Sequence, residues 1–162
     1  MGQARMVMDA ITAAVMSGDA DAIAACYAED AVADTPDAGR MEGREAIAQY
    51  LANFSEAFSD MSFETVEALE IGNIAIDEGL LIGRHTGTLR TPDGDIAPTG
   101  KQVRIRECDL LAVREGVAVS HRFYYNELDL LAQLGLLDAR QLAGMLPIQR
   151  VDLTEAEATQ PV

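Results

Sequence analysis

The sequence predicts an α+β fold in which N-terminal helices pack on a curved antiparallel sheet around a pocket. Apolar residues recur at helical spacing over the first third of the chain, and from Met61 onward they alternate with polar residues, as in strands. Helices that precede a run of strands, instead of alternating with them, pack together on one sheet face. If the sheet curves around the helices, the two enclose a cavity, the usual place for a small ligand.

Three helices are expected before Met61. The first carries an apolar stripe that Gly18 is placed to end, and Asp19 is a suitable N-cap for the second. The third carries apolar residues at helical spacing, namely Ile47, Tyr50, Leu51, Phe54 and Phe58. Together these helices supply the apolar layer that covers the sheet.

The alternating pattern predicts strands at residues 61–71, 74–89, 102–113 and 117–125. The connection over residues 90–100 holds two prolines and two glycines, which favours a mobile lid over the pocket mouth. After the last strand, Asn126 can cap a short helix that Gly135 ends. We expect one domain over residues 1–146 and a partly disordered tail over residues 147–162.

The charge of the chain excludes some classes of partner. The 162 residues include 27 acidic and 12 basic side chains, which give a net charge of −15. Such a surface repels nucleic-acid phosphates and anionic lipids, so neither nucleic acid nor a membrane is expected as partner. The two cysteines have no metal-type spacing, and no segment reaches the length of a membrane span. We therefore expect a cytoplasmic protein without a bound metal.

The hairpin over residues 102–125 carries the most informative side chains. A three-residue turn at 114–116 would pair Asp109 with His121, and Glu107 with Phe123. All these residues share one face, and the same face is apolar near the turn, where it includes Val117 and Val119. The carboxylates and the histidine are therefore expected to point toward the core.

Two interpretations of Asp109 and His121 follow. A carboxylate and an imidazole in an apolar cavity are what proton transfer to a bound ligand requires, which makes both residues candidate catalytic groups. The alternative is a satisfied polar pair that fixes the strand register.

The opposite face of the hairpin carries three arginines and a tyrosine, Arg104, Arg106, Arg122 and Tyr124. On an acidic chain, this strip indicates either a homodimer interface or a solvated sheet face.

Five short stretches resemble one known family. They are Tyr27-Ala28-Glu29-Asp30-Ala31-Val32, Met41 to Ile47, Gly83 to Leu89, Pro98-Thr99-Gly100-Lys101 and Gln133-Leu134-Gly135. In order and spacing they resemble the SnoaL-like polyketide cyclases of the nuclear-transport-factor-2-like (NTF2-like) superfamily. The resemblance implies a cone around a pocket, frequent dimers through the outer sheet face, and ring closure by an intramolecular aldol step without metal or cofactor.

The resemblance also locates the family's acid/base groups on this chain. The aspartate that serves cyclases as acid/base falls on Phe123, and their nearby histidine falls on Asp109. His121 and Arg122, in contrast, match the His-Arg pair that precedes the cyclase acid. Ketosteroid-isomerase-type relatives use a base together with a tyrosine donor, for which Tyr27 or Tyr125 is available.

Further side chains are candidates for contact with the ligand: Asp34, Tyr27, Tyr50, Phe54, His85, Glu107, Phe123 and Tyr125. For Asp34 the alternative is a turn-forming role before Thr35-Pro36, and for Tyr27 and Tyr50 it is core packing. For His85 the alternative is a plain position at a strand end. We expect a small hydrophobic ligand and, in the catalytic interpretation, a cofactor-free cyclase or isomerase. The alternative function is a non-catalytic, dimeric ligand-binding module.

Overall fold

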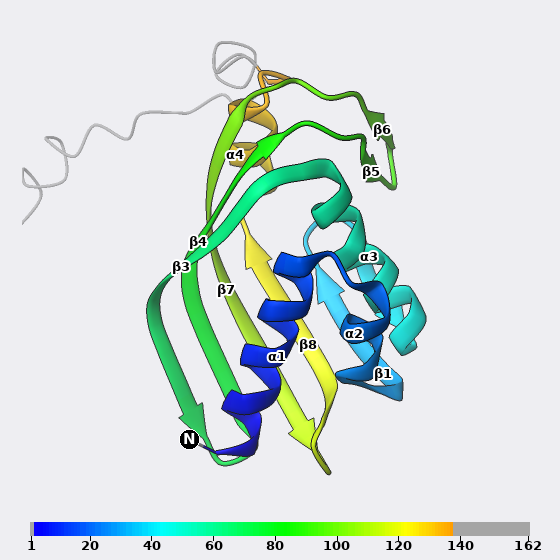
Figure 1. Ribbon diagram of the computed structural model, residues 1–162, viewed down its shortest axis with the longest axis vertical. Coiled ribbons are helices and arrows are strands. Elements are labelled where there is room, and N and C mark those ends of the chain that lie inside the picture. The colour runs from blue at the N-terminus through cyan, green and yellow to red at the C-terminus, as the bar shows by residue number, and fades with distance from the viewer. Residues whose placement is uncertain (1, 138–162) are drawn as a thin grey trace, which may run out of the picture.

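The computed structural model describes residues 2–137, which form three N-terminal helices, a curved sheet and a short closing helix (Figure 1). The helices are α1 (Gln3–Ser17), α2 (Ala20–Ala25), α3 (Arg44–Ala57) and α4 (Glu127–Gln133). The strands are β1 (Tyr27–Thr35), β2 (Gly39–Glu42), β3 (Phe58–Ile71), β4 (Ile74–His85), β5 (Leu89–Thr91), β6 (Gly94–Ile96), β7 (Gln102–Arg114) and β8 (Val117–Tyr125). The predicted α+β class is confirmed. The expected tail lies outside the described residues.

The helix boundaries follow from local chemistry. Gly18 ends α1 in the left-handed conformation, with φ of 70°. The side chain of Asp19 accepts a hydrogen bond from the Ala22 amide and so caps α2. Asn126 caps α4 in the same way through the Asp129 amide. These three predicted boundary residues are confirmed. Within residues 2–137, no helix is both long and apolar enough to cross a bilayer.

The main sheet has six strands in the order β2-β1-β8-β7-β4-β3. It is mixed, because β1 runs parallel to β8 while the other neighbours are antiparallel. The expectation of a purely antiparallel sheet is therefore wrong at this one pair. The reason is that β1 reaches β8 without a hairpin connection, so the turn chemistry that enforces antiparallel pairing does not act on it.

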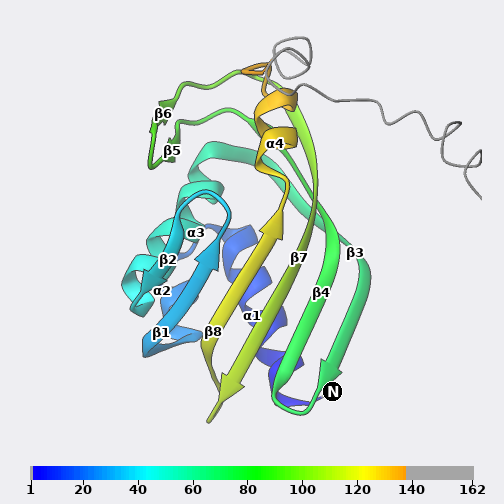
Figure 2. The same ribbon diagram turned by 180° about the vertical axis from the view of Figure 1, so that it is seen from behind.

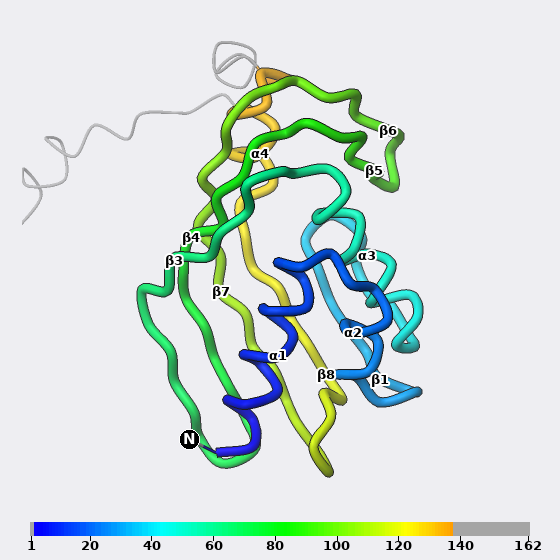
Figure 3. The backbone as a smooth tube through the Cα atoms, in the orientation of Figure 1, coloured from blue at the N-terminus to red at the C-terminus, as the bar shows by residue number. Residues whose placement is uncertain are grey.

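The helices and the bend of the sheet create the interior. Helices α1 to α3 lie on one face of the sheet, and Figure 2 shows the other face from behind. The backbone trace in Figure 3 shows β3, β4 and β7 bending over toward α3 at one end. One apolar cluster lies under α1, α2 and α3, and includes Met8, Ile23 and Leu111. A second, smaller cluster lies near α4 and includes Leu89, Ile105 and Leu134.

The β7–β8 hairpin differs from its predicted form. Its turn has two residues, Glu115 and Gly116, both with positive φ (53° and 83°), the conformation that matches the twist of paired strands. A bulge follows, because the pairing shifts between Ala112 and Val113. As a result Asp109 lies opposite Phe123, and not opposite His121 as predicted. Near the turn, Ala118 is the buried residue in place of the predicted Val117 and Val119.

Residues 89–96 form a small hairpin, β5–β6, and not an irregular lid. Asn53 on α3 holds this hairpin through both backbone groups of Arg90: its side-chain nitrogen donates to the Arg90 carbonyl at 2.6 Å, and its oxygen accepts from the Arg90 amide at 3.1 Å. Leu89 is buried. The hairpin supplies no residue to the two cavities described below.

Candidate functional site

Two adjoining hollows lie between the helices and the concave face of the sheet. The inner cavity, of about 70 Å³, is lined by residues of α1, α3, β3, β4, β7 and β8. The apolar pocket, of about 30 Å³, lies nearer to α4 and shares Phe54, Leu81, Glu107 and Tyr125 with the inner cavity. On this measure one water molecule needs about 10–15 Å³, so a ligand of more than a few heavy atoms must displace side chains.

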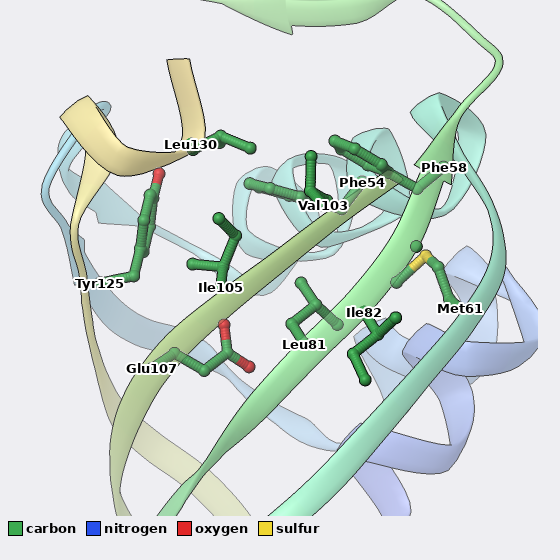
Figure 4. A pocket seen from close by; sticks show the side chains of 11 residues that line it. Phe54, Phe58, Met61, Leu81, Ile82, Val103, Ile105, Glu107, Tyr125 and Leu130 are labelled. Carbon is green, nitrogen blue, oxygen red and sulfur yellow. The ribbon is translucent and has the colours of Figure 1, made fainter. Parts of the chain in front are cut away.

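The apolar pocket is bounded almost entirely by hydrocarbon side chains (Figure 4). Glu107 is the one acidic residue among those labelled there, and it comes from β7. The ring of Tyr125 stands near Ile105, with its hydroxyl toward Leu130 on α4. A ligand that fills this part of the site is therefore mostly hydrophobic.

Two carboxyl groups on β7 point into the inner cavity. Glu107 and Asp109 are two positions apart on one strand, so their side chains leave the same face. The Oδ1 atom of Asp109 is shielded from solvent and has no hydrogen-bond partner among the described residues. Burial raises the pKa of Glu107 to about 7. Burial, followed by the charges of Glu107 and Asp77, raises the pKa of Asp109. This pair can therefore hold a proton at a pH where ordinary carboxyl groups have lost theirs.

A third carboxylate is neutralised by an arginine. Asp77 on β4 lies opposite Asp109 in the sheet register and is 5% exposed. Arg5 of α1 donates to both of its carboxylate oxygens, with Nη2 to Oδ2 at 2.7 Å. The hydrogen bond to Asp77 raises the pKa of Arg5. The pair ties α1 to the sheet and leaves Asp109 and Glu107 as the uncompensated acids.

His121 forms a buried pair with Tyr27. The Tyr27 hydroxyl and His121 Nδ1 are 2.6 Å apart, and each residue is 1% exposed. Nε2 of His121 has no partner among the described residues. Burial lowers the pKa of His121 to about 3, so the imidazole is uncharged at neutral pH. No hydrogen bond joins His121 to Asp109 within residues 2–137, although both line the inner cavity.

Phe123 extends the cavity wall at the position where the resemblance places the cyclase acid. Its ring centroid is 3.9 Å from that of His121 and 6.2 Å from that of Tyr50. Tyr50 donates to Asp37 at 2.9 Å and packs edge-on against Phe54. Burial raises the pKa of Tyr50, which therefore stays protonated. This part of the wall is aromatic and uncharged.

Asp34 and His85 lie elsewhere. The Asp34 side chain is 46% exposed, lies 3.8 Å from Arg40, and is absent from the linings of both hollows. His85 is fully buried at the end of β4, where its Nδ1 accepts from the Thr99 amide at 3.2 Å. Burial lowers the pKa of His85. The structure therefore brings Glu107, Asp109, His121, Phe123, Tyr50, Phe54 and Tyr125 together; Asp34 and His85 lie outside, and Tyr27 contacts His121 without lining either hollow.

The arginines of the outer face are partly neutralised within the chain. Arg104 donates to Glu64 at 2.8 Å, and Arg106 forms an ion pair with Glu78. Tyr124 is 53% exposed on the same face. The predicted cationic strip is therefore a face of mixed charge.

Sequence reasoning missed Asp77 and Arg5. A signal for Asp77 was present, because it is a single acid at an inward position of the otherwise apolar alternation Ala75-Asp77-Gly79-Leu81. Arg5 had no comparable signal, since its role depends on how α1 crosses the sheet. Within residues 2–137, His, Cys, Asp and Glu side chains form no group of three or more that could hold a metal ion.

A cone of helices and curved sheet around a mostly apolar hollow with a few buried polar groups is typical of the NTF2-like class of small proteins. The sequence profile of the SnoaL-like polyketide cyclases matches residues 5–134. The chain therefore belongs to the SnoaL-like polyketide cyclase family. No curated protein sequence matches it significantly.

Solved structures agree on the fold. IdmH from Streptomyces antibioticus, a candidate polyketide cyclase, is 24% identical with a TM-score of 0.66, over 83% of this chain and 99% of its own. A hypothetical protein from Catenulispora acidiphila DSM 44928, with a ketosteroid isomerase-like fold and in complex with trimethylamine, is 23% identical with a TM-score of 0.66, over 81% and 93%. An epoxide hydrolase of the LEH-like type from M. tuberculosis is 17% identical with a TM-score of 0.62, over 88% and 94%. At these identities the likeness shows the fold alone.

Proposed function

We propose that this chain binds a small, mostly hydrophobic carbonyl compound in the inner cavity and catalyses a cofactor-free proton transfer on it, as isomerases and cyclases do. The observation that carries the proposal is the Asp109 carboxyl, with an unpartnered, shielded oxygen beside Glu107 in an otherwise apolar site. Acid–base groups with raised pKa values in a cavity are typical of catalytic sites.

The proposed reaction needs only this carboxyl pair. The Asp109 carboxylate takes a proton from the carbon next to the ligand carbonyl, and the electron pair moves onto the carbonyl oxygen as an enolate. If the ligand has a carbon–carbon double bond next to that carbon, the protonated Asp109 returns the proton to the far carbon of the resulting dienolate, so the double bond moves into conjugation with the re-formed carbonyl and the isomerisation is complete. In a cyclisation, the enolate carbon instead attacks a second carbonyl of the same ligand, and the new alkoxide takes the proton. Glu107 sets the proton affinity of Asp109 through its charge.

Phe123 supports a shift in the position of the acid. Its ring supplies no proton where the cyclase acid would stand, so proton transfer falls to the carboxyl group of Asp109, which lies directly opposite on the neighbouring strand.

We place the protein in the cytoplasm and propose that it works without a metal or cofactor.

A test needs no knowledge of the natural substrate. Purified full-length protein is incubated in D₂O with a panel of small cyclic ketones, and exchange of the α-protons is followed by NMR. Asp109→Asn should slow the catalysed exchange by about 10²–10⁴-fold, the usual contribution of one positioned acid or base. The matched control is Asp93→Asn, which alters an exposed carboxyl away from the cavity and should leave exchange unchanged. Equal exchange by wild type and Asp109→Asn would refute the catalytic role.

A non-catalytic binding module is the second candidate. The acid-free Phe123 position and the small cavity favour it. It predicts ligand binding without any catalysed exchange, and an Asp109→Asn variant that changes affinity alone.

A further inference from the structure

We propose that Tyr27 positions His121 so that the imidazole Nε2–H faces the inner cavity and donates a hydrogen bond to an acceptor oxygen of the ligand. This inference rests on the proposed function, because the oxygen is the one on which negative charge develops during proton transfer. It adds a donor to the acid–base pair and names the ligand group that this part of the wall recognises.

The tautomer follows from the hydrogen bonds of Tyr27. Its hydroxyl lies 2.6 Å from His121 Nδ1 and has no other partner among the described residues. If Nδ1 carried the proton and donated to Tyr27, the buried hydroxyl hydrogen would have no acceptor there. If instead the hydroxyl donates to Nδ1, both atoms are satisfied, and the ring proton of the neutral imidazole must be on Nε2. Burial, and then the charge of Asp109, raises the pKa of Tyr27, so this donor keeps its proton.

The location of Nε2 indicates a ligand. His121 lines the inner cavity, and Nε2 lies on the ring edge that points away from the bond to Tyr27. The atom is shielded from solvent and unpartnered among residues 2–137, while the residue is 1% exposed. A buried donor without a partner is costly, so a site of this kind is completed by an acceptor from the ligand or from water.

The chemistry of the donor selects the ligand class. An uncharged N–H bonds a carbonyl oxygen and bonds an enolate oxygen more strongly, because hydrogen bonds to charged acceptors are the stronger ones. Burial keeps the imidazole uncharged, since it lowers the pKa of His121. An ammonium group has only hydrogen-bond donors and cannot accept a hydrogen bond from Nε2–H, although the carboxyl groups of Glu107 and Asp109 would attract its charge. The inference therefore favours ketones over amines next to His121.

The first experiment reads the tautomer directly by ¹⁵N NMR of the imidazole rings at pH 6–8. The chain has two histidines, so the His121 signals are identified by their loss in His121→Gln. We expect a neutral ring with the proton on Nε2 and a hydrogen-bonded Nδ1. A ring protonated on Nδ1, or on both nitrogens, would overturn the inference. This measurement uses the wild-type chain and needs no turnover, so its failure is distinct from unchanged exchange in Asp109→Asn.

The second experiment tests positioning and ligand class. In Tyr27→Phe, the Nδ1 signal should move to the position of a nitrogen without a hydrogen bond; an unchanged signal would overturn the role of Tyr27. Cyclohexanone and cyclohexylammonium are then added to the wild type at equal concentration. The ketone should move the Nε2–H proton to lower field, as a new hydrogen bond does, and the ammonium ion should not. A shift with both probes, or with neither, would overturn the assignment of an oxygen ligand.

Discussion

Replacement of Glu107 by glutamine should stabilise the protein above neutral pH, because the carboxylate at this position is held in an unfavourable environment. Burial raises its pKa from 4.5 to about 7 in the folded state. In a group of this kind the folded state disfavours the charged form. The contribution of Glu107 to the free energy of unfolding is therefore fully present below its pKa in the unfolded chain. It is lost as the pH rises through the window from about 4.5 to 7. The glutamine variant has no charge to bury and escapes that loss.

The size of the effect follows from the pKa shift. One pKa unit corresponds to about 1.4 kcal/mol, so the rise to about 7 amounts to roughly 3 kcal/mol at pH 8. At pH 5 only a small part of this difference between the folded and unfolded states has developed, so the variant should gain less than about 1 kcal/mol in free energy of unfolding. For a domain of this size, 1 kcal/mol moves Tm by about 2–4 °C, which gives roughly 6–12 °C at pH 8 as an upper value.

The assay is thermal and urea unfolding of wild type and Glu107→Gln at pH 5, 6.5 and 8. Glu67→Gln is the control, because Glu67 is exposed on β3 and its loss changes the net charge of the chain by the same amount. The reasoning would be refuted by a gain that is equal at pH 5 and pH 8, or by an equal gain in the control.

Three further predictions concern the frame of the site. Arg5→Ala should lower the free energy of unfolding by about 3–5 kcal/mol, because it leaves Asp77 buried and unpaired. The control Arg40→Ala should change it by under about 1 kcal/mol, since Arg40 pairs only at the surface. Equal losses of the two variants in urea unfolding would contradict this. We expect a homodimer through the outer sheet face, so sedimentation should show a dimer at micromolar concentration that Tyr124→Glu converts to monomer; a wild-type monomer, or a dimer that persists in the variant, would argue against this face. The hairpin at residues 89–96 should exchange its amide hydrogens faster than β7 does, because it is a separate two-stranded sheet; equal protection would show that it moves only with the core.

Helix boundaries could be predicted from the sequence because they depend on single residues. Gly18, Asp19 and Asn126 each act through a local conformation or hydrogen bond that does not need the rest of the fold. The hairpin at residues 89–96 was missed because its proline and glycine content favours loops, whereas its anchor is the distant side chain of Asn53. Local chemistry is readable in advance, and long-range anchoring is not.

The inward face of β7 was predicted correctly, but its cross-strand partners were not. The choice between a three-residue and a two-residue turn depends on whether Glu115 accepts a positive φ, which the sequence leaves open. The shorter turn shifts the pairing by one residue and the bulge shifts it by a second, so Asp109 and His121 kept their face and lost their pairing. Asp34 was misplaced for a related reason, since its direction depends on the irregular parallel pairing of β1 with β8.

The bulge in the last hairpin determines which alternate side chains of β8 face the cavity. Ala118 is buried near the turn and His121 is buried at the site, although an odd number of positions separates them and a regular strand would turn them to opposite faces. If the same residues formed a regular strand without a bulge, burying Ala118 would direct Arg122 and Tyr124 inward and expose His121 and Phe123. Deletion of Val119, the unpaired residue of the bulge, would place Ala118 and His121 two positions apart and keep both of them inward on a regular strand. The bulge therefore keeps the neutral aromatic side chains, and not Arg122, inside the cone.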